Sequence, residues 1–181
     1  MAKFYPALTD QHRLFIHRQK IFFTASAADA GRVNLSPKGM DSLRILDDQR
    51  VAYLDLTGSG NETAAHVRQN GRMTLMFCSF DDDMLILRLY GRGRAIQSRD
   101  ADWEALRAQF GELPGVRQII ELRVDSVQTS CGYAVPRYVY AGGRDTLTRW
   151  AEKKGTQGLL DYWREKNQTS IDGLPSGLLT E

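Results

Sequence analysis

The chain has 181 residues, of which 42% are hydrophobic and 25% are charged, a composition typical of a folded globular protein and not of a disordered or collagen-like chain. Its 24 basic and 22 acidic residues leave a net charge of +2, without the basic excess typical of a nucleic-acid-binding protein. No charge-free stretch approaches the roughly 20 residues that a membrane-spanning helix needs. We therefore expect a globular protein that binds neither nucleic acid nor membrane.

The first elements are predicted from capping and alternation. Thr9 is a good N-cap for a short helix that ends near Lys20. Branched and aromatic residues, or period-two alternation, then predict strands at 21–26, 32–36 and 50–57. Pro37 and Gly39 are expected to end the second of these strands.

A helix is predicted at 62–69, between an Asn61 N-cap and an Asn70-Gly71 C-cap. Two long apolar strands, 73–80 and 84–96, are joined by three aspartates that predict a hairpin turn. Gly91 and Gly93 in the second strand indicate a bulge or a sharp bend. The remaining expected elements are a helix at 100–110, a strand at 116–127, short helices at 146–150 and 159–166, and a loop-like tail at 171–175.

This order contains six strands without a crossover helix between each pair, so a parallel sheet is not expected. The pattern predicts a mainly β (α+β) fold, a six-stranded antiparallel sheet or barrel with helices packed outside. We expect residues 1–140 to form this domain and residues 141–181 to form a helical extension packed on it.

The sequence lacks the motifs of several common metal, nucleotide and catalytic sites. The three histidines, His12, His17 and His66, form no HExxH pattern and no CxxC pair is present, so a zinc site is not expected. Glycine patterns of dinucleotide and P-loop sites are also missing, as is a G-x-S-x-G elbow. Cys78 and Cys131 suggest no disulfide framework. The N-terminus does not look like a secretory signal, and we expect a reduced, cytoplasmic protein.

Thr57, Ser59, Asn61 and Thr63 alternate with two glycines directly before a helix. Hydroxyls, exposed amides and the positive end of a helix can bind an anion such as phosphate. The alternative is a plain strand–turn–helix junction, and Glu62 favours it because a carboxylate in the first turn repels phosphate.

A second polar group, Asn34, Ser36 and Lys38, lies at a strand end, where Lys38 or Arg32 could meet a phosphate. The alternative is an ordinary strand end. Cys131, in a loop over 130–136, is either a reactive thiol or a buried, inert one.

Taken in order, these segments resemble the pyridoxamine 5′-phosphate oxidase-like superfamily of FMN-binding split barrels. The resemblance runs from about Phe22 to about Val139, and its clearest pieces are 22–26, 32–39, 51–66 and 70–77. It implies a split barrel, and a homodimer with FMN at the subunit interface. The apolar tail 171–179, which has no predicted helix or strand to bury it, also favours a dimer.

The resemblance also implies site residues. Arg32 matches an arginine that meets the flavin phosphate, Lys38 matches the lysine that follows it, and Thr57 matches a threonine beside the flavin. The Ser-Arg-Lys phosphate loop of the oxidases falls on Asn61, Glu62 and Thr63, so two positive charges are missing there. The predicted FMN-binding residues are Arg32, Asn34, Ser36, Lys38, Thr57, Ser59, Asn61 and Thr63.

Three functions follow from these observations. The first is a flavin-dependent oxidoreductase with an unknown small-molecule substrate, in which the flavin supplies the redox chemistry. The second is a non-catalytic protein that carries or senses a flavin or a tetrapyrrole. The third is a split barrel without a cofactor.

Overall fold

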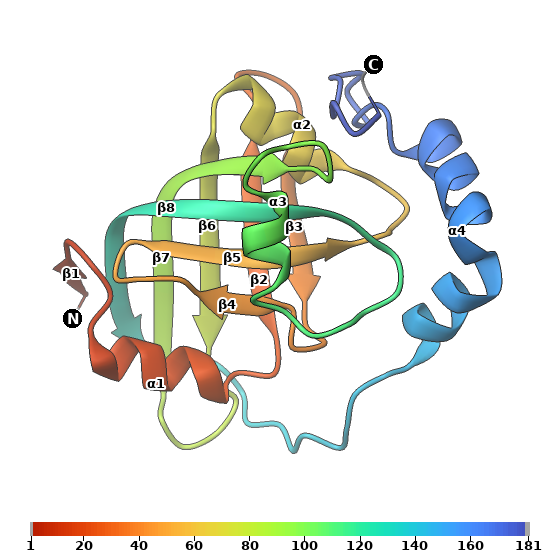
Figure 1. Ribbon diagram of the computed structural model, residues 1–181. Helices are drawn as coiled ribbons and strands as arrows, with labels where there is room; N and C mark the ends of the chain where they lie inside the picture. The colour runs from red at the N-terminus through yellow and green to blue at the C-terminus, as the bar shows by residue number, and fades with distance from the viewer. Residues whose placement is uncertain (1, 180–181) are drawn as a thin grey trace.

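The computed structural model describes residues 2–179, which form one antiparallel sheet of eight strands and four helices (Figure 1). The strands are β1 (Lys3–Tyr5), β2 (Phe22–Ala27), β3 (Val33–Lys38), β4 (Leu43–Ile45), β5 (Arg50–Leu56), β6 (Arg72–Cys78), β7 (Leu85–Ile96) and β8 (Val116–Cys131). The helices are α1 (Asp10–Arg18), α2 (Glu62–Gln69), α3 (Trp103–Arg107) and α4 (Thr146–Lys166).

The sheet curls into a half-barrel because its longest strands pair with several partners. The strand order is β3-β2-β6-β7-β8-β5-β4, and β1 also pairs with β8. One edge of β8 pairs with β7 along most of its length, while the other pairs first with β5 and then with β1. A bulge lies between Tyr90 and Gly91, where a Cβ on Gly91 would be 1.9 Å from the carbonyl oxygen of Arg123. Of the predicted bulge or bend, the bulge is therefore confirmed at Gly91.

The predicted antiparallel split-barrel fold is confirmed, but the sheet has eight strands and not six. The two additional strands, β1 and β4, are only three residues long, too short to leave an alternation pattern. The prediction that Pro37 ends its strand was wrong, because β3 continues to Lys38. A proline is tolerated there because β3 is an edge strand, on which a missing backbone donor costs no ladder hydrogen bond.

Two apolar clusters fill the fold. The larger one contains Phe22, whose ring contacts the rings of Tyr53 and Phe77, and it is closed by Phe15 and Ile16 of α1. The smaller one, which includes Phe110, packs beneath α3. Helix α2 packs on β2, β6 and β7, so its N-terminus is held at the edge of the sheet that carries β3.

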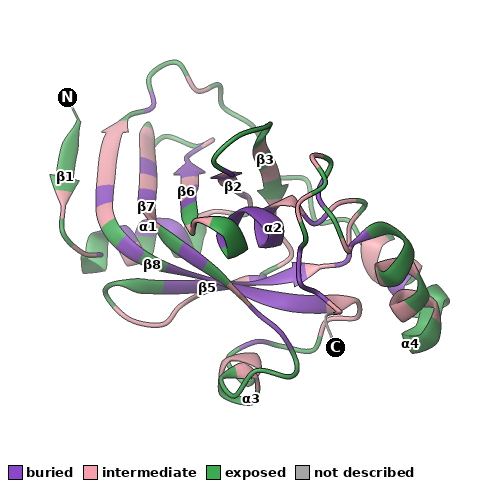
Figure 2. Cartoon of the chain, turned by 90° about the horizontal axis from the view of Figure 1, so that it is seen from above, coloured by how far each residue is buried: buried purple, intermediate pink, exposed green. Residues whose placement is uncertain are grey.

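The C-terminal part of the chain lies at the side of the sheet, after a long and mostly exposed segment over 133–145 (Figures 1 and 2). Gly155 has a φ of +65° and divides α4 into two helical halves, which correspond to the two short helices predicted. No described helix is long and apolar enough to cross a membrane. Cys131 does not lie in a loop as predicted: it is the exposed last residue of β8.

Candidate functional site

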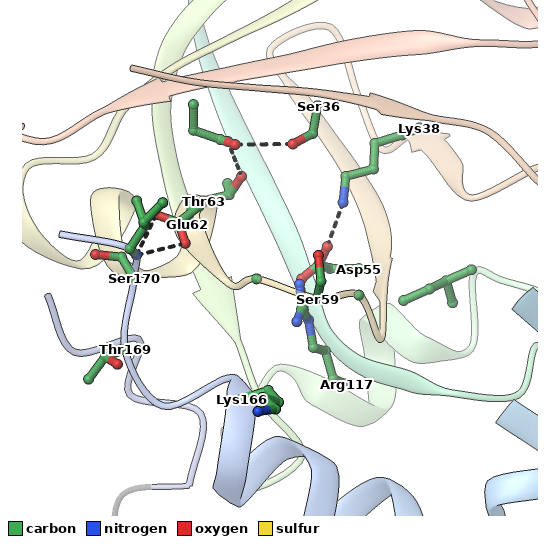
Figure 3. Close-up of a pocket in the computed structure, with 15 residues that line it drawn as sticks. Ser36, Lys38, Asp55, Ser59, Glu62, Thr63, Arg117, Lys166, Thr169 and Ser170 are labelled. Carbon is green, nitrogen blue, oxygen red and sulfur yellow. Dashed lines mark hydrogen bonds and ion pairs between the residues drawn. The ribbon is translucent and has the colours of Figure 1, made fainter. Parts of the chain in front are cut away.

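A cleft of about 600 Å³ opens where β3, the end of β5, the start of α2 and the C-terminal segment meet (Figure 3). This volume is in the range of small-molecule and cofactor sites. The lining residues are Asn34, Ser36, Lys38, Asp55, Leu56, Gly58, Ser59, Gly60, Glu62, Thr63, Arg117, Lys166, Thr169, Ser170 and Ile171.

Strand β3 forms one wall of the cleft because its side chains alternate. Asn34, Ser36 and Lys38 line the cleft, while Val33 and Leu35, which alternate with them, are 75% and 64% exposed. Successive residues of a strand point to opposite faces, so every second residue faces the cleft. The polar pattern seen at this strand end therefore belongs to one wall.

The charged centre of the cleft is Asp55, whose carboxylate is buried between two cations. Its Oδ1 accepts a hydrogen bond from Lys38 Nζ at 2.9 Å, and its Oδ2 accepts one from Arg117 Nε at 2.9 Å. Gln118 Nε2 also donates to Oδ2, at 2.8 Å. Both oxygens of the carboxylate thus accept hydrogen bonds, and one negative charge is shared by two positive charges.

The pKa values of this cluster favour its charged forms. Burial alone would raise the pKa of Asp55, but the charges and hydrogen bonds of Arg117 and Lys38 outweigh it and hold that pKa well below its usual range. Burial alone would lower the pKa of Lys38, yet the neighbouring Asp55 carboxylate raises it. The cluster therefore carries a net charge of +1 over the whole physiological pH range.

A neutral hydrogen-bond network lies beside this cluster. Asn34 Nδ2 donates to Ser26 Oγ at 3.2 Å and to Thr63 Oγ1 at 3.1 Å, and Asn34 Oδ1 accepts from Ser36 Oγ at 3.0 Å. Ser26 Oγ lies 3.1 Å from Nδ1 of the buried His66. Both ends of the Asn34 amide thus bind other side chains of the protein, and these contacts fix the orientation of the amide.

The predicted phosphate loop is occupied in part by the chain's own C-terminal segment. Both carboxylate oxygens of Glu62 accept from the backbone N–H of Ile171, at 3.0 and 3.1 Å. The amide of Asn61 is buried, where it donates to the carbonyl of Asn167 and accepts from Gln118. Glu62 is thus turned toward the tail, and Asn61 makes no side-chain N-cap hydrogen bond of the kind predicted.

The structure brings five of the eight predicted site residues into the cleft: Asn34, Ser36, Lys38, Ser59 and Thr63. Their binding of FMN stays a prediction.

The other three predicted residues hold the C-terminal segment in place. Arg32 forms an ion pair with Asp172, and its backbone N–H donates to the same carboxylate. Thr57 donates to the carbonyl of Gly115 and accepts from the indole N–H of Trp163, both at 2.8 Å. Together with Asn61, these residues lie outside the lining of the cleft.

Sequence reasoning missed five polar residues of the cleft, namely Asp55, Arg117, Lys166, Thr169 and Ser170. Asp55 left a usable signal, because an acidic residue inside an apolar strand is almost never buried without a partner. No pattern in the sequence connects it to Arg117, 62 residues further along.

Comparison with known proteins agrees with this architecture. The family model of pyridoxamine 5′-phosphate oxidase matches residues 8–131. Over 193 aligned residues the chain is 39% identical to the pyridoxamine 5′-phosphate oxidase family protein ustO of Aspergillus flavus, covering 97% of this chain and 78% of that protein.

Solved structures share the fold at lower sequence identity. HupZ of Group A Streptococcus is 24% identical with a TM-score of 0.55, covering 66% of this chain and 91% of that one. HutZ, the heme storage protein of Vibrio cholerae, is 14% identical with a TM-score of 0.50, covering 70% of this chain and 97% of that one. These two likenesses concern the fold alone. From the family model and the Aspergillus relative, this chain belongs to the pyridoxamine 5′-phosphate oxidase family.

Proposed function

We propose that the protein binds FMN in this cleft and acts as a flavin-dependent oxidoreductase on a small molecule. One observation carries the proposal: the cluster of Lys38, Asp55 and Arg117 gives the cleft a net positive charge, and hydroxyl groups line the cleft beside it. The phosphate would contact Lys38, with Ser59 and Thr63 as hydroxyl donors. Arg32 and Asn61, also predicted for this role, are engaged by Asp172 and Asn167 instead.

The donor set of the cleft suits the parts of FMN. Ammonium and hydroxyl groups recognise a phosphate, while Asn34 and Ser36 offer polar groups of the kind that a ribityl chain needs. Leu56 and Ile171 add apolar surface. When bound, FMN would supply the redox chemistry, and the residues of the chain would bind it, orient it and exclude water.

The alternative is a non-catalytic carrier of a flavin or a tetrapyrrole. The likeness to HutZ, a heme storage protein, raises this possibility. Haem iron in proteins is held by His, Cys, Met or Tyr, and none of these residue types is among the described residues that line the cleft. This chemistry favours a flavin over a haem as the ligand of the cleft.

Titration calorimetry of the apo-protein with FMN and with riboflavin tests the phosphate site. We expect Lys38→Ala to weaken FMN binding by about 10- to 150-fold, the value of one charged hydrogen bond of about 1.5–3 kcal/mol, and to leave riboflavin binding nearly unchanged. Lys153→Ala, on the exposed side of α4, is the matched control. Equal affinities of the native protein for FMN and riboflavin would refute a phosphate site.

Absorbance and reduction separate the enzyme from the carrier. A protein purified with FMN shows flavin absorbance, and we expect the bound flavin of an oxidoreductase to be reduced by NADH or NADPH. Flavin absorbance without reduction by either nucleotide would favour the carrier. A cytoplasmic location remains part of the proposal.

We also propose a homodimer, as family membership implies. The tail gives only partial support to a dimer, because Leu178 is 3% exposed within its own chain while Ile171 is 69% exposed. A better candidate surface is the outer face of β3, where Val33 and Leu35 are exposed on an edge strand. A stable interface should bury more than about 1,000 Å². Light scattering that gives a single species of 20.5 kDa would contradict the dimer.

A further inference from the structure

The guanidinium of Arg117 is only partly used by its partners in the described structure. The residue is 6% exposed, and the side-chain hydrogen bond that it makes runs from Nε to Asp55 Oδ2. The terminal nitrogen Nη1 is buried without a hydrogen-bond partner. Most buried polar groups are hydrogen-bonded, and those that are not call for an explanation.

The two carboxylates that line the cleft with Arg117 are engaged by other donors. Both oxygens of Asp55 already accept hydrogen bonds, from Lys38 on one side and from Arg117 and Gln118 on the other. Glu62, the other carboxylate that lines the cleft, accepts from the backbone of Ile171. Neither of these carboxylates accepts a hydrogen bond from Nη1 of Arg117.

The position of Arg117 suits a ligand. It lines the cleft, and Lys38 and Arg117 converge on Asp55 from opposite sides (Figure 3). Because Asp55 neutralises only one of these two charges, the cluster keeps a positive charge at the wall of the cleft. The planar guanidinium offers two N–H groups in the geometry that matches a carboxylate or a phosphate.

We infer that the terminal nitrogens of Arg117 bind an oxyanion of the ligand, a phosphate or a carboxylate, beside the ammonium of Lys38. Asp55 is then a positioning residue, which holds the guanidinium by Nε and leaves its other end free. The inference rests on the proposed function where the oxyanion is the phosphate of FMN. It stands apart from that function where the oxyanion belongs to a second, anionic ligand.

The test uses Arg117→Lys, which keeps the positive charge beside Asp55 but removes the two-pronged donor. Arg107→Lys, on α3 and paired with Glu112, is the control. FMN and riboflavin are titrated calorimetrically into both variants and the native protein. Binding of inorganic phosphate is measured by the rise that it causes in the melting temperature of each protein. Loss of one charged hydrogen bond predicts about 10- to 150-fold weaker binding of the anion.

If FMN binding falls in Arg117→Lys and riboflavin binding does not, the oxyanion is the flavin phosphate. If both flavins bind as before, but phosphate stabilises the native protein and not Arg117→Lys, the oxyanion belongs to another ligand. If FMN, riboflavin and phosphate act alike on native protein and variant, the inference is overturned, while flavin binding itself still supports the proposed function. If neither flavin binds the native protein, the proposed function fails and the phosphate measurement still decides the role of Arg117.

A buried arginine is costly to replace, so a second variant guards against misfolding. The double change Asp55→Asn with Arg117→Gln removes one charge of each sign together, which avoids leaving the carboxylate buried without Arg117. We expect it to lose anion binding by the same factor. Unchanged anion binding in this folded variant would also overturn the inference.

Discussion

Replacing Asp55 by Asn should destabilise the protein strongly, although the two side chains have the same shape. The Asp55 carboxylate is 2% exposed and accepts hydrogen bonds from Lys38, Arg117 and Gln118. In the variant the amide must turn its NH2 group toward one of these donors, and the two cations face each other without a counter-charge. Breaking a buried ion pair by removing one partner costs about 3–5 kcal/mol, a large part of a total of about 5–15 kcal/mol.

The pH dependence of this difference has a defined sign. The pKa of Asp55 is lower in the folded protein than its ordinary value of 3.8, so the folded state binds the proton of this carboxyl less readily than the unfolded state. Its contribution to stability is complete above about pH 4 and is lost as the pH falls through the folded-state pKa. The difference between native protein and Asp55→Asn should therefore be constant near neutral pH and shrink in acid.

Urea unfolding followed by circular dichroism measures both effects. Asp102→Asn is the control, since Asp102 pairs with Arg94 at a half-exposed site, where such a pair contributes less than about 1 kcal/mol. An Asp55→Asn variant that unfolds within 1 kcal/mol of the native protein at pH 7, with the same dependence on urea, would refute the reasoning. So would a difference that grows below pH 4.

Two further predictions concern the tail and the barrel. Glu62→Ala removes the acceptor of the Ile171 N–H. Amide hydrogen exchange at Ile171 should therefore accelerate by about fivefold, which corresponds to roughly 1 kcal/mol per hydrogen bond. Unchanged exchange would show that Glu62 does not hold the tail. Gly91→Ala should prevent folding or lower the melting temperature by more than 10 °C, because the added Cβ would overlap the backbone of β8. The control is Gly111→Ala, where no atom lies within 4 Å of the added Cβ, and this variant should melt like the native protein. Equal melting of the two glycine variants would contradict the bulge.

Local sequence pattern predicted most of the fold. The six long strands and the helix over 62–69 follow from alternation, apolar runs and breakers, and these are properties of neighbouring residues. Where the prediction was wrong, the tertiary context decided: β1 and β4 exist only because longer strands offer them an edge. Pro37 stays within its strand because β3 is an edge strand.

The polar pattern along β3 also predicted one wall of the cleft. Asn34, Ser36 and Lys38 were chosen from alternation and do line it. Arg32, which also belongs to that segment, lies just before the first residue of β3 and pairs with Asp172. Its partner is 140 residues away in the sequence, so composition around Arg32 carried no trace of this pairing.

The sequence by itself determined which segments become strands and helices and which strand face is polar, because side-chain periodicity and capping act over a few residues. Only the tertiary structure decided how the charges are used. The joining of Asp55 to Arg117, and of Glu62 to Ile171, spans 62 and 109 residues. Such contacts depend on strand order and on where the tail lies. Each buried charge must find a partner in the folded chain because burial without one is too costly, and that search is settled by the fold as a whole.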